Sequence, residues 1–198
     1  MKLNKFLTFF IFFLINFSTI SNSYSIEPDV FVQSTVNRAS EALNNKFTKE
    51  EKIAKLKSIA DETVDIKGIG FYTLGSYRKD LNDEQKKIYQ DLFKKYFLKS
   101  FSSRLAEYSN PEIQVNSKKK LNESYTMVSS ILVATETRPE VKIEWRVYTK
   151  VPTDPKIRDL IIEGLSLART QKEEFSSIIQ SNDGDINALF NTLKEFVK

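Results

Sequence analysis

The stretch Val141-Lys142-Ile143-Glu144-Trp145-Arg146-Val147-Tyr148-Thr149-Lys150-Val151 decides the fold class of this chain. Apolar or β-branched side chains stand at every second position from Val141 to Thr149, and charged side chains fill most of the positions between them. Because the side chains of a strand alternate between the two faces of a sheet, this pattern predicts a β-strand with one dry and one wet face. Antiparallel sheets commonly have that division, so we expect such a sheet around this stretch.

Three other segments have the composition of strands. Residues 112–121 alternate apolar and polar side chains, and 125–136 are rich in β-branched residues. Residues 156–167 follow the turn signal Pro152-Thr153-Asp154-Pro155. We therefore expect an antiparallel sheet of about four strands.

Helical patterns stand before and after these strands. Their apolar side chains recur at intervals of three and four, and several segments begin at residues that cap helices well. The predicted helices are 29–44, a helix that begins at the capping box of Thr48, 65–74, 82–108, 168–180 and 185–198. Helices that come first, then strands, then helices again are typical of an α+β fold.

The predicted helix 82–108 has a broad aromatic stripe. Its members are Tyr89, Leu92, Phe93, Tyr96, Phe97, Phe101, Leu105 and Tyr108. We expect this stripe to pack against the dry face of the sheet, because each surface has to be buried. The two surfaces could form a closed core, or they could leave an apolar cavity for a ligand between sheet and helices. The periodicity does not separate these two interpretations.

The first residues are typical of a secretory signal peptide. Lys2 and Lys5 precede a short apolar block, Phe6–Ile15, and Ser23-Tyr24-Ser25 has the small-x-small pattern of a cleavage site. A membrane-spanning helix needs about 20 apolar residues, which is more than this block supplies. We therefore expect 1–25 to be removed and 26–198 to form a single domain outside the cytosol.

The composition excludes several function classes. The chain has no cysteine and no histidine, so it lacks a thiol nucleophile and the commonest general base, and no glycine-rich phosphate loop is present. Removal of 1–25 takes two lysines and no acid, which lowers the net charge from +4 to +2. Such a charge does not favour nucleic acid as a partner, and the run Lys118–Lys120 is interpreted as a solvated turn. The chain is therefore a candidate binding protein.

A catalytic alternative depends on two carboxylates. Asp159 and Glu163 are expected on one face of the fourth strand, and paired carboxylates can perform acid–base chemistry. No nucleophile or metal cluster accompanies them, so we predict that the protein is not an enzyme. An interaction or structural module with a closed core is the other alternative.

Four stretches resemble a known family and stand in the same order as in it. They are Val64-Asp65-Ile66 with Thr73-Leu74-Gly75-Ser76-Tyr77, then Ser100–Tyr108, Ile161-Ile162-Glu163-Gly164-Leu165-Ser166-Leu167, and Glu174–Ile179 with Gly184. Together they make 29–198 similar to the MlaC-type periplasmic phospholipid carriers, also called toluene-tolerance auxiliary components. Departures from the family pattern are Arg78, where the family often has Trp, Pro155–Ile157, and Gln171.

The resemblance implies a carrier of glycerophospholipid with no cofactor. Such a carrier moves lipid between two membrane complexes: an inner-membrane ABC permease with an MCE-domain ring, and an outer-membrane lipoprotein–porin complex. This transport maintains the lipid asymmetry of the outer membrane. A monomer is the default expectation. The expected lipid-binding residues are Leu74, Tyr77, Phe93, Phe97, Phe101 and Leu105 on helices, and Ile131, Trp145, Val147, Ile161 and Leu165 on strands. For Ile131, Ile161 and Leu165 the face of the sheet is left open.

The physics of lipid transfer agrees with this expectation. Each buried methylene contributes about 0.8 kcal/mol, so transfer of two acyl chains of ~15 methylenes each from an apolar site to water costs on the order of 20 kcal/mol of free energy. The charged headgroup is costly to bury and should stay at the mouth of the cavity, which predicts weak headgroup selectivity. A lipid held this firmly should leave only when the carrier docks on a partner that supplies the energy.

Overall fold

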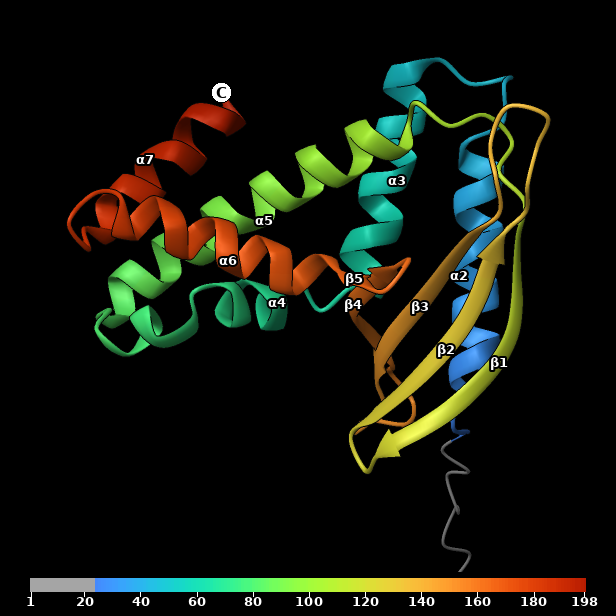
Figure 1. The fold of residues 1–198 in the computed structure, drawn as a ribbon, viewed down its shortest axis with the longest axis horizontal. Helices are drawn as coiled ribbons and strands as arrows, with labels where there is room; N and C mark the ends of the chain where they lie inside the picture. The colour runs from blue at the N-terminus through green and yellow to red at the C-terminus, as the bar shows by residue number, and fades with distance from the viewer. Residues whose placement is uncertain (1–23) are drawn as a thin grey trace, which may run out of the picture.

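A curved antiparallel sheet and two groups of helices make up the protein (Figure 1). The structure is a computed structural model that describes residues 24–198. Most of the predicted signal peptide therefore lies outside the described residues. The sheet has the strand order β1-β2-β3-β4-β5, with β1 Ile113–Asn122, β2 Tyr125–Leu132, β3 Val141–Tyr148, β4 Lys156–Ile162 and β5 Leu165–Ser166.

The helices precede and follow the strands, as the sequence predicts. They are α2 Pro28–Ala42, α3 Lys49–Thr63, α4 Ile66–Thr73, the 3₁₀ helix η1 Gly75–Lys79, α5 Asp83–Leu105, α6 Leu167–Gln180 and α7 Ile186–Val197. The α+β class is therefore confirmed. In residues 24–198 we find no helix that is both long and apolar enough to span a membrane.

Local side-chain chemistry explains where the helices begin and end. Thr48 and Asn82 each form a capping box. Their side chains accept a hydrogen bond from the backbone N–H of the third helical residue, and the side chain of that residue accepts one from their own backbone N–H. The Asp65 side chain accepts from the backbone N–H of Gly68 and so caps α4. Gly75 has a φ of 58°, a left-handed conformation that glycine adopts freely, and α4 ends just before it.

The fourth strand is shorter than the sequence predicts. Glu163 and Gly164 adopt φ values of 49° and 82°, and this left-handed pair turns the chain back at the end of β4. The predicted single strand 156–167 is therefore wrong: it is the hairpin of β4 and the two-residue β5. The predicted strand 125–136 likewise ends at Leu132.

Helix α2 covers the dry face of the sheet. Val32 and Val36 of α2 are buried against Val128 of β2 and Val147 of β3. The registry places Trp145 opposite Val128, on this same face, and its indole N–H donates to Ser130 Oγ at 2.9 Å. The dry and wet division predicted for 141–151 is therefore present, with α2 as the cover.

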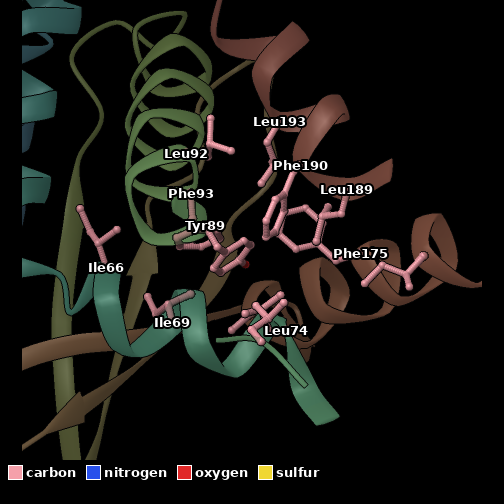
Figure 2. Packing of buried hydrophobic residues seen from close by; sticks show 13 residues of the cluster. Ile66, Ile69, Leu74, Tyr89, Leu92, Phe93, Phe175, Leu189, Phe190 and Leu193 are labelled. Carbon is pink, nitrogen blue, oxygen red and sulfur yellow. The ribbon is translucent and has the colours of Figure 1, made fainter. Parts of the chain in front are cut away.

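The aromatic stripe of α5 is buried by other helices instead of by the sheet. Tyr89 and Phe93 lie 5.8 Å apart, centroid to centroid (Figure 2). Phe190 of α7 stacks on Tyr89, and Phe175 of α6 meets Phe93 edge to face. The Tyr89 hydroxyl lies 2.8 Å from Thr73 Oγ1, which satisfies its polar atom inside this core. Our expectation that the stripe packs on the dry face is therefore wrong, because α4, α6 and α7 supply their own apolar faces to it.

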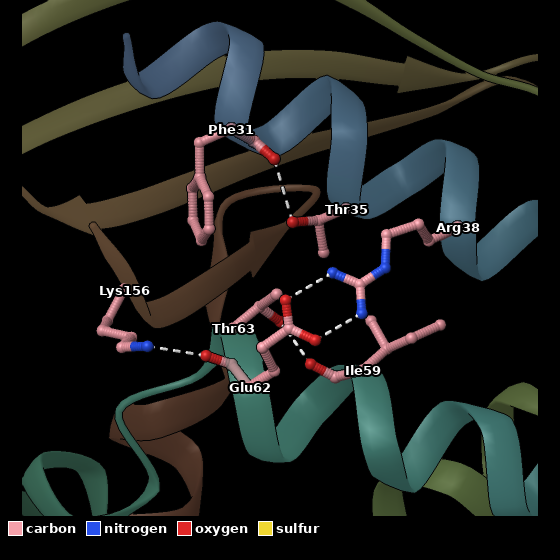
Figure 3. Close-up of polar contacts among 7 residues, drawn as sticks. All are labelled: Phe31, Thr35, Arg38, Ile59, Glu62, Thr63 and Lys156. Carbon is pink, nitrogen blue, oxygen red and sulfur yellow. Dashed lines mark hydrogen bonds and ion pairs between the residues drawn. The ribbon is translucent and has the colours of Figure 1, made fainter. Parts of the chain in front are cut away.

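Polar contacts join α2 to α3, and α3 to the sheet. The Arg38 guanidinium makes two parallel hydrogen bonds, at 2.8 and 2.6 Å, to the carboxylate of Glu62 (Figure 3). Lys156 of β4 donates to the Glu62 carbonyl oxygen at 2.7 Å. The Arg38 and Glu62 side chains are 39% and 61% exposed, so solvent screens this pair and it serves mainly to set helix orientation.

Candidate functional site

A cavity of about 490 Å³ lies between the wet face of the sheet and the helices. Its walls come from α4, η1, the β1–β2 hairpin, β3, β4 and the start of α6. The lining residues are Gly68, Ile69, Tyr72, Arg78, Leu121, Asn122, Tyr125, Arg146, Arg158, Asp159 and Ala168. Its volume is within the range of pockets that hold small ligands.

The wall contributed by the sheet follows from strand alternation. Arg146 stands between Trp145 and Val147 in β3, so its side chain points away from α2. Tyr125 of β2 pairs with Tyr148 of β3, and their rings lie 5.4 Å apart on this same face. The charged positions of this stretch therefore lie on the wet face of the sheet, where Arg146 lines the cavity, and the apolar positions face α2.

Arg158 ties the helical wall of the cavity to the sheet. Its Nε and Nη2 atoms both lie 2.6 Å from Asp65 Oδ2, at the start of α4, and its Nη1 donates to the Tyr125 hydroxyl oxygen at 2.7 Å. The guanidinium also lies 3.7 Å from the ring centroid of Tyr148. Burial opposes the charge of Arg158, but the hydrogen bonds to Tyr125 and Asp65 outweigh it and raise the pKa of Arg158.

Asp159 organises the start of α6 and has a structural role. Its Oδ2 accepts from Ser166 Oγ at 2.6 Å and its Oδ1 accepts from the Ala168 N–H at 3.0 Å. The prediction that Asp159 and Glu163 share one strand face is wrong. Glu163 lies in the turn after β4, where its carboxylate accepts from the Lys142 N–H.

The predicted lipid-binding residues on helices lie in the helical cores. Leu74 and Phe93 are 0% and 1% exposed inside the cluster of α4–α7, and Tyr77 and Phe97 pack against that cluster. Phe101 stacks on Phe97 at 5.6 Å, and Leu105 packs against a separate cluster of α2, α3 and the end of α5.

The predicted residues on strands are divided between two faces. Trp145 and Val147 lie on the α2 face, whereas Ile131 and Ile161 pair with Lys142 and Glu144 on the opposite face. Leu165 is 59% exposed in the β4–β5 hairpin. None of the eleven predicted residues lines the 490 Å³ cavity, as the structure describes it, and their role in lipid binding stays a prediction.

The cavity residues that sequence reasoning missed are mostly charged or aromatic. Arg146 was assigned only to the wet face of 141–151, and Asp159 only to the carboxylate pair of the catalytic alternative. The wet-face alternation was the signal that could have placed them together. Arg78 was visible only as a departure from the family pattern. Tyr125 and Tyr72 gave no signal, because their position depends on how α4 meets the hairpin.

A second hollow, of about 610 Å³, runs along α6. Tyr72 borders both hollows, and the other walls of the second are polar residues of α6 such as Arg169, Lys172 and Glu173. It lies on the helical surface and is not bounded by the sheet. Within residues 24–198 we find no group of three or more acidic side chains that could hold a metal ion.

These features define an α+β binding protein whose cavity lies between a sheet and a helical layer. The MlaC protein family model matches residues 33–195, and the chain therefore belongs to the MlaC family. The fold is similar to the solved structure of a phospholipid-binding protein from Ralstonia solanacearum in complex with a phospholipid. That match has a TM-score of 0.72 and 21% identity, and it covers 87% of this chain and 97% of the other.

Proposed function

We propose that this protein is a phospholipid carrier that takes up acyl chains through the cavity between α4 and the wet face of the sheet. The observation that carries the proposal is a cavity bounded by sheet and helices in a chain of the MlaC family. The phospholipid in the complex of the Ralstonia solanacearum protein, which has the same fold, supports it. Export from the cytosol, which the first 25 residues predict, and a periplasmic location, which the family implies, are part of the proposal.

The walls combine the two kinds of chemistry that a phospholipid requires. Ile69, Leu121 and Ala168 offer apolar surface, and Tyr72 and Tyr125 offer aromatic rings with polar tips. Guanidinium groups stand beside them, where a charged headgroup could be satisfied. An acyl chain can therefore be buried while the headgroup remains in a polar environment.

The cavity has to widen to hold two acyl chains, and the architecture favours such a movement. The apolar cluster of α4–α7 contains no strand residue, and the apolar cluster of α2 with the sheet contains no residue of α4–α7. The described links between them are largely polar, such as the pair of Asp65 and Arg158 and the bond from Asp65 N–H to the Ile157 carbonyl at 2.9 Å. Separating the two layers therefore exposes little of either buried core.

Directed exchange with membrane complexes follows from the energy of the bound lipid. Two buried acyl chains are worth on the order of 20 kcal/mol, which makes free dissociation into water too slow. We propose that the carrier, as a monomer, exchanges lipid only when docked on an inner-membrane ABC permease complex with an MCE-domain ring or on an outer-membrane lipoprotein–porin complex. Family membership supports this assignment, and no catalytic step is proposed.

The test is native mass spectrometry of the exported chain purified from a diderm bacterium. We expect phospholipid bound in stoichiometric amount. Leu121→Glu should abolish the lipid, because it puts a charge on the cavity wall, whereas Val30→Glu, on α2 and outside the cavity, should retain it. Leu121 and Val30 are exposed, at 43% and 61%, so both variants should fold. Lipid-free protein in repeated preparations would contradict the proposal and favour an interaction module with a closed core.

A further inference from the structure

The cavity carries more positive than negative charge. Three guanidinium groups, of Arg78, Arg146 and Arg158, line it, and Asp159 is the one acidic residue among the lining residues that the structure describes. Arg158 is neutralised by Asp65 at 2.6 Å. The charges of Arg78 and Arg146 therefore face the cavity with a single carboxylate to balance them.

Arg146 keeps its hydrogen-bond donors free for a ligand. Its nearest anion is Asp159 Oδ2 at 3.7 Å, which is too long for a hydrogen bond. The Asp159 oxygens already accept from Ser166 and Ala168. In residues 24–198 the Arg146 guanidinium has no hydrogen-bond partner, and its side chain is 42% exposed.

Arg78 comes from the opposite wall. It lies in η1, next to α4, whereas Arg146 lies in β3, so the two cations border one space from the helical and the sheet side. In the part of the chain that the structure describes, Arg78 has no ion-pair partner.

We propose that Arg78 and Arg146 bind the phosphate of the carried lipid and thereby select a headgroup with net negative charge. Guanidinium groups match phosphate oxygens in geometry and form charge-assisted hydrogen bonds with them. A zwitterionic headgroup would bring its ammonium close to the same arginines, which lowers its affinity. This inference rests on the proposed function, and it replaces the weak headgroup selectivity expected from the sequence with a preference for anionic lipid.

The test is competition between two lipids from one vesicle. The delipidated protein is incubated with vesicles of equal parts phosphatidylglycerol and phosphatidylcholine, and bound lipid is counted by native mass spectrometry. We expect about tenfold enrichment of phosphatidylglycerol, equivalent to about 1.4 kcal/mol, and a smaller enrichment at high salt. Arg78→Gln with Arg146→Gln should reduce the enrichment to within about twofold. Arg104→Gln, which removes an exposed arginine of α5 outside the cavity, should leave it unchanged.

The possible failures are distinguishable. Equal uptake of both lipids by the wild type, unchanged in the double variant, contradicts this inference and leaves the proposed function intact. No uptake of either lipid contradicts both. Glycerol 3-phosphate is the soluble probe for a free phosphate ligand: we expect it to bind at least a hundredfold more weakly than phosphatidylglycerol, and equal affinity would contradict a lipid site.

Discussion

Replacing Asp65 by alanine should weaken the link between the helical wall of the cavity and the sheet. The substitution removes two interactions at once. It removes the cap on α4, where Asp65 Oδ1 accepts from the Gly68 N–H at 2.8 Å, and the ion pair with Arg158 at 2.6 Å. Asp65→Asn is the matched variant, because the amide oxygen keeps the cap while the charge is lost.

The expected magnitude follows from the surroundings of the two groups. An N-cap is worth about 1 kcal/mol. The Arg158 and Asp65 side chains are 29% and 21% exposed, so their pair lies between an exposed pair, worth about 0–1 kcal/mol, and a buried pair, whose disruption costs about 3–5 kcal/mol. We therefore assign about 2 kcal/mol to the pair, which gives about 3 kcal/mol for Asp65→Ala and about 2 kcal/mol for Asp65→Asn.

Urea unfolding followed by circular dichroism measures both variants. With a slope of about 2 kcal/mol per molar urea, the midpoint should fall by about 1.5 M for alanine and about 1 M for asparagine. In an Arg158→Gln background Asp65→Asn should cost less than about 1 kcal/mol, because its partner is already missing. An asparagine variant as stable as the wild type would refute the reasoning, because the ion pair would then contribute nothing.

Three further predictions concern stability and pH. Tyr89→Phe should cost about 1 kcal/mol at pH 7, because a buried hydrogen bond is lost. Burial raises the pKa of Tyr89 above 10.0, so the stability of the wild type should fall as pH rises beyond 10. Urea titration at each pH should show a smaller loss of stability for the variant in that range. The hydrogen bond from Lys118 lowers the pKa of Asp29 below 3.8, so this pair stabilises the fold above about pH 4 and its contribution is lost in more acidic solution. Stability should therefore fall less steeply with decreasing pH in Lys118→Gln than in the wild type. An equal dependence of stability on pH in both proteins would count against the pair. Phe93→Ala should cost about 3–5 kcal/mol because it empties the helical core, whereas Leu165→Ala should change thermal stability by less than about 0.5 kcal/mol.

Features that depend on local sequence were predictable. The capping boxes at Thr48 and Asn82 and the alternation in 141–151 are encoded within a few residues, and the structure has each of them. The order of helices, strands and helices then gave the α+β class. The turn at Glu163 was missed because a non-glycine residue takes a left-handed conformation there.

Features that depend on which surfaces meet were not predictable. The aromatic stripe and the dry sheet face each require a partner, but periodicity does not say that α7 covers Tyr89 or that α2 covers Val147. The same limit applied to the cavity. Its sheet wall includes charged positions such as Arg146, which in an isolated strand are indistinguishable from solvated ones.

Photo-crosslinking tests the position of the lipid most directly. A phospholipid with a diazirine at the middle of one acyl chain is loaded into the protein and irradiated, and the labelled residues are read by peptide mass spectrometry. We predict labels on Ile69, Tyr72 and Leu121, on the walls of the cavity between α4 and the wet face of the sheet. Labels confined to Val32 and Val147, between α2 and the dry face, would contradict the proposed site.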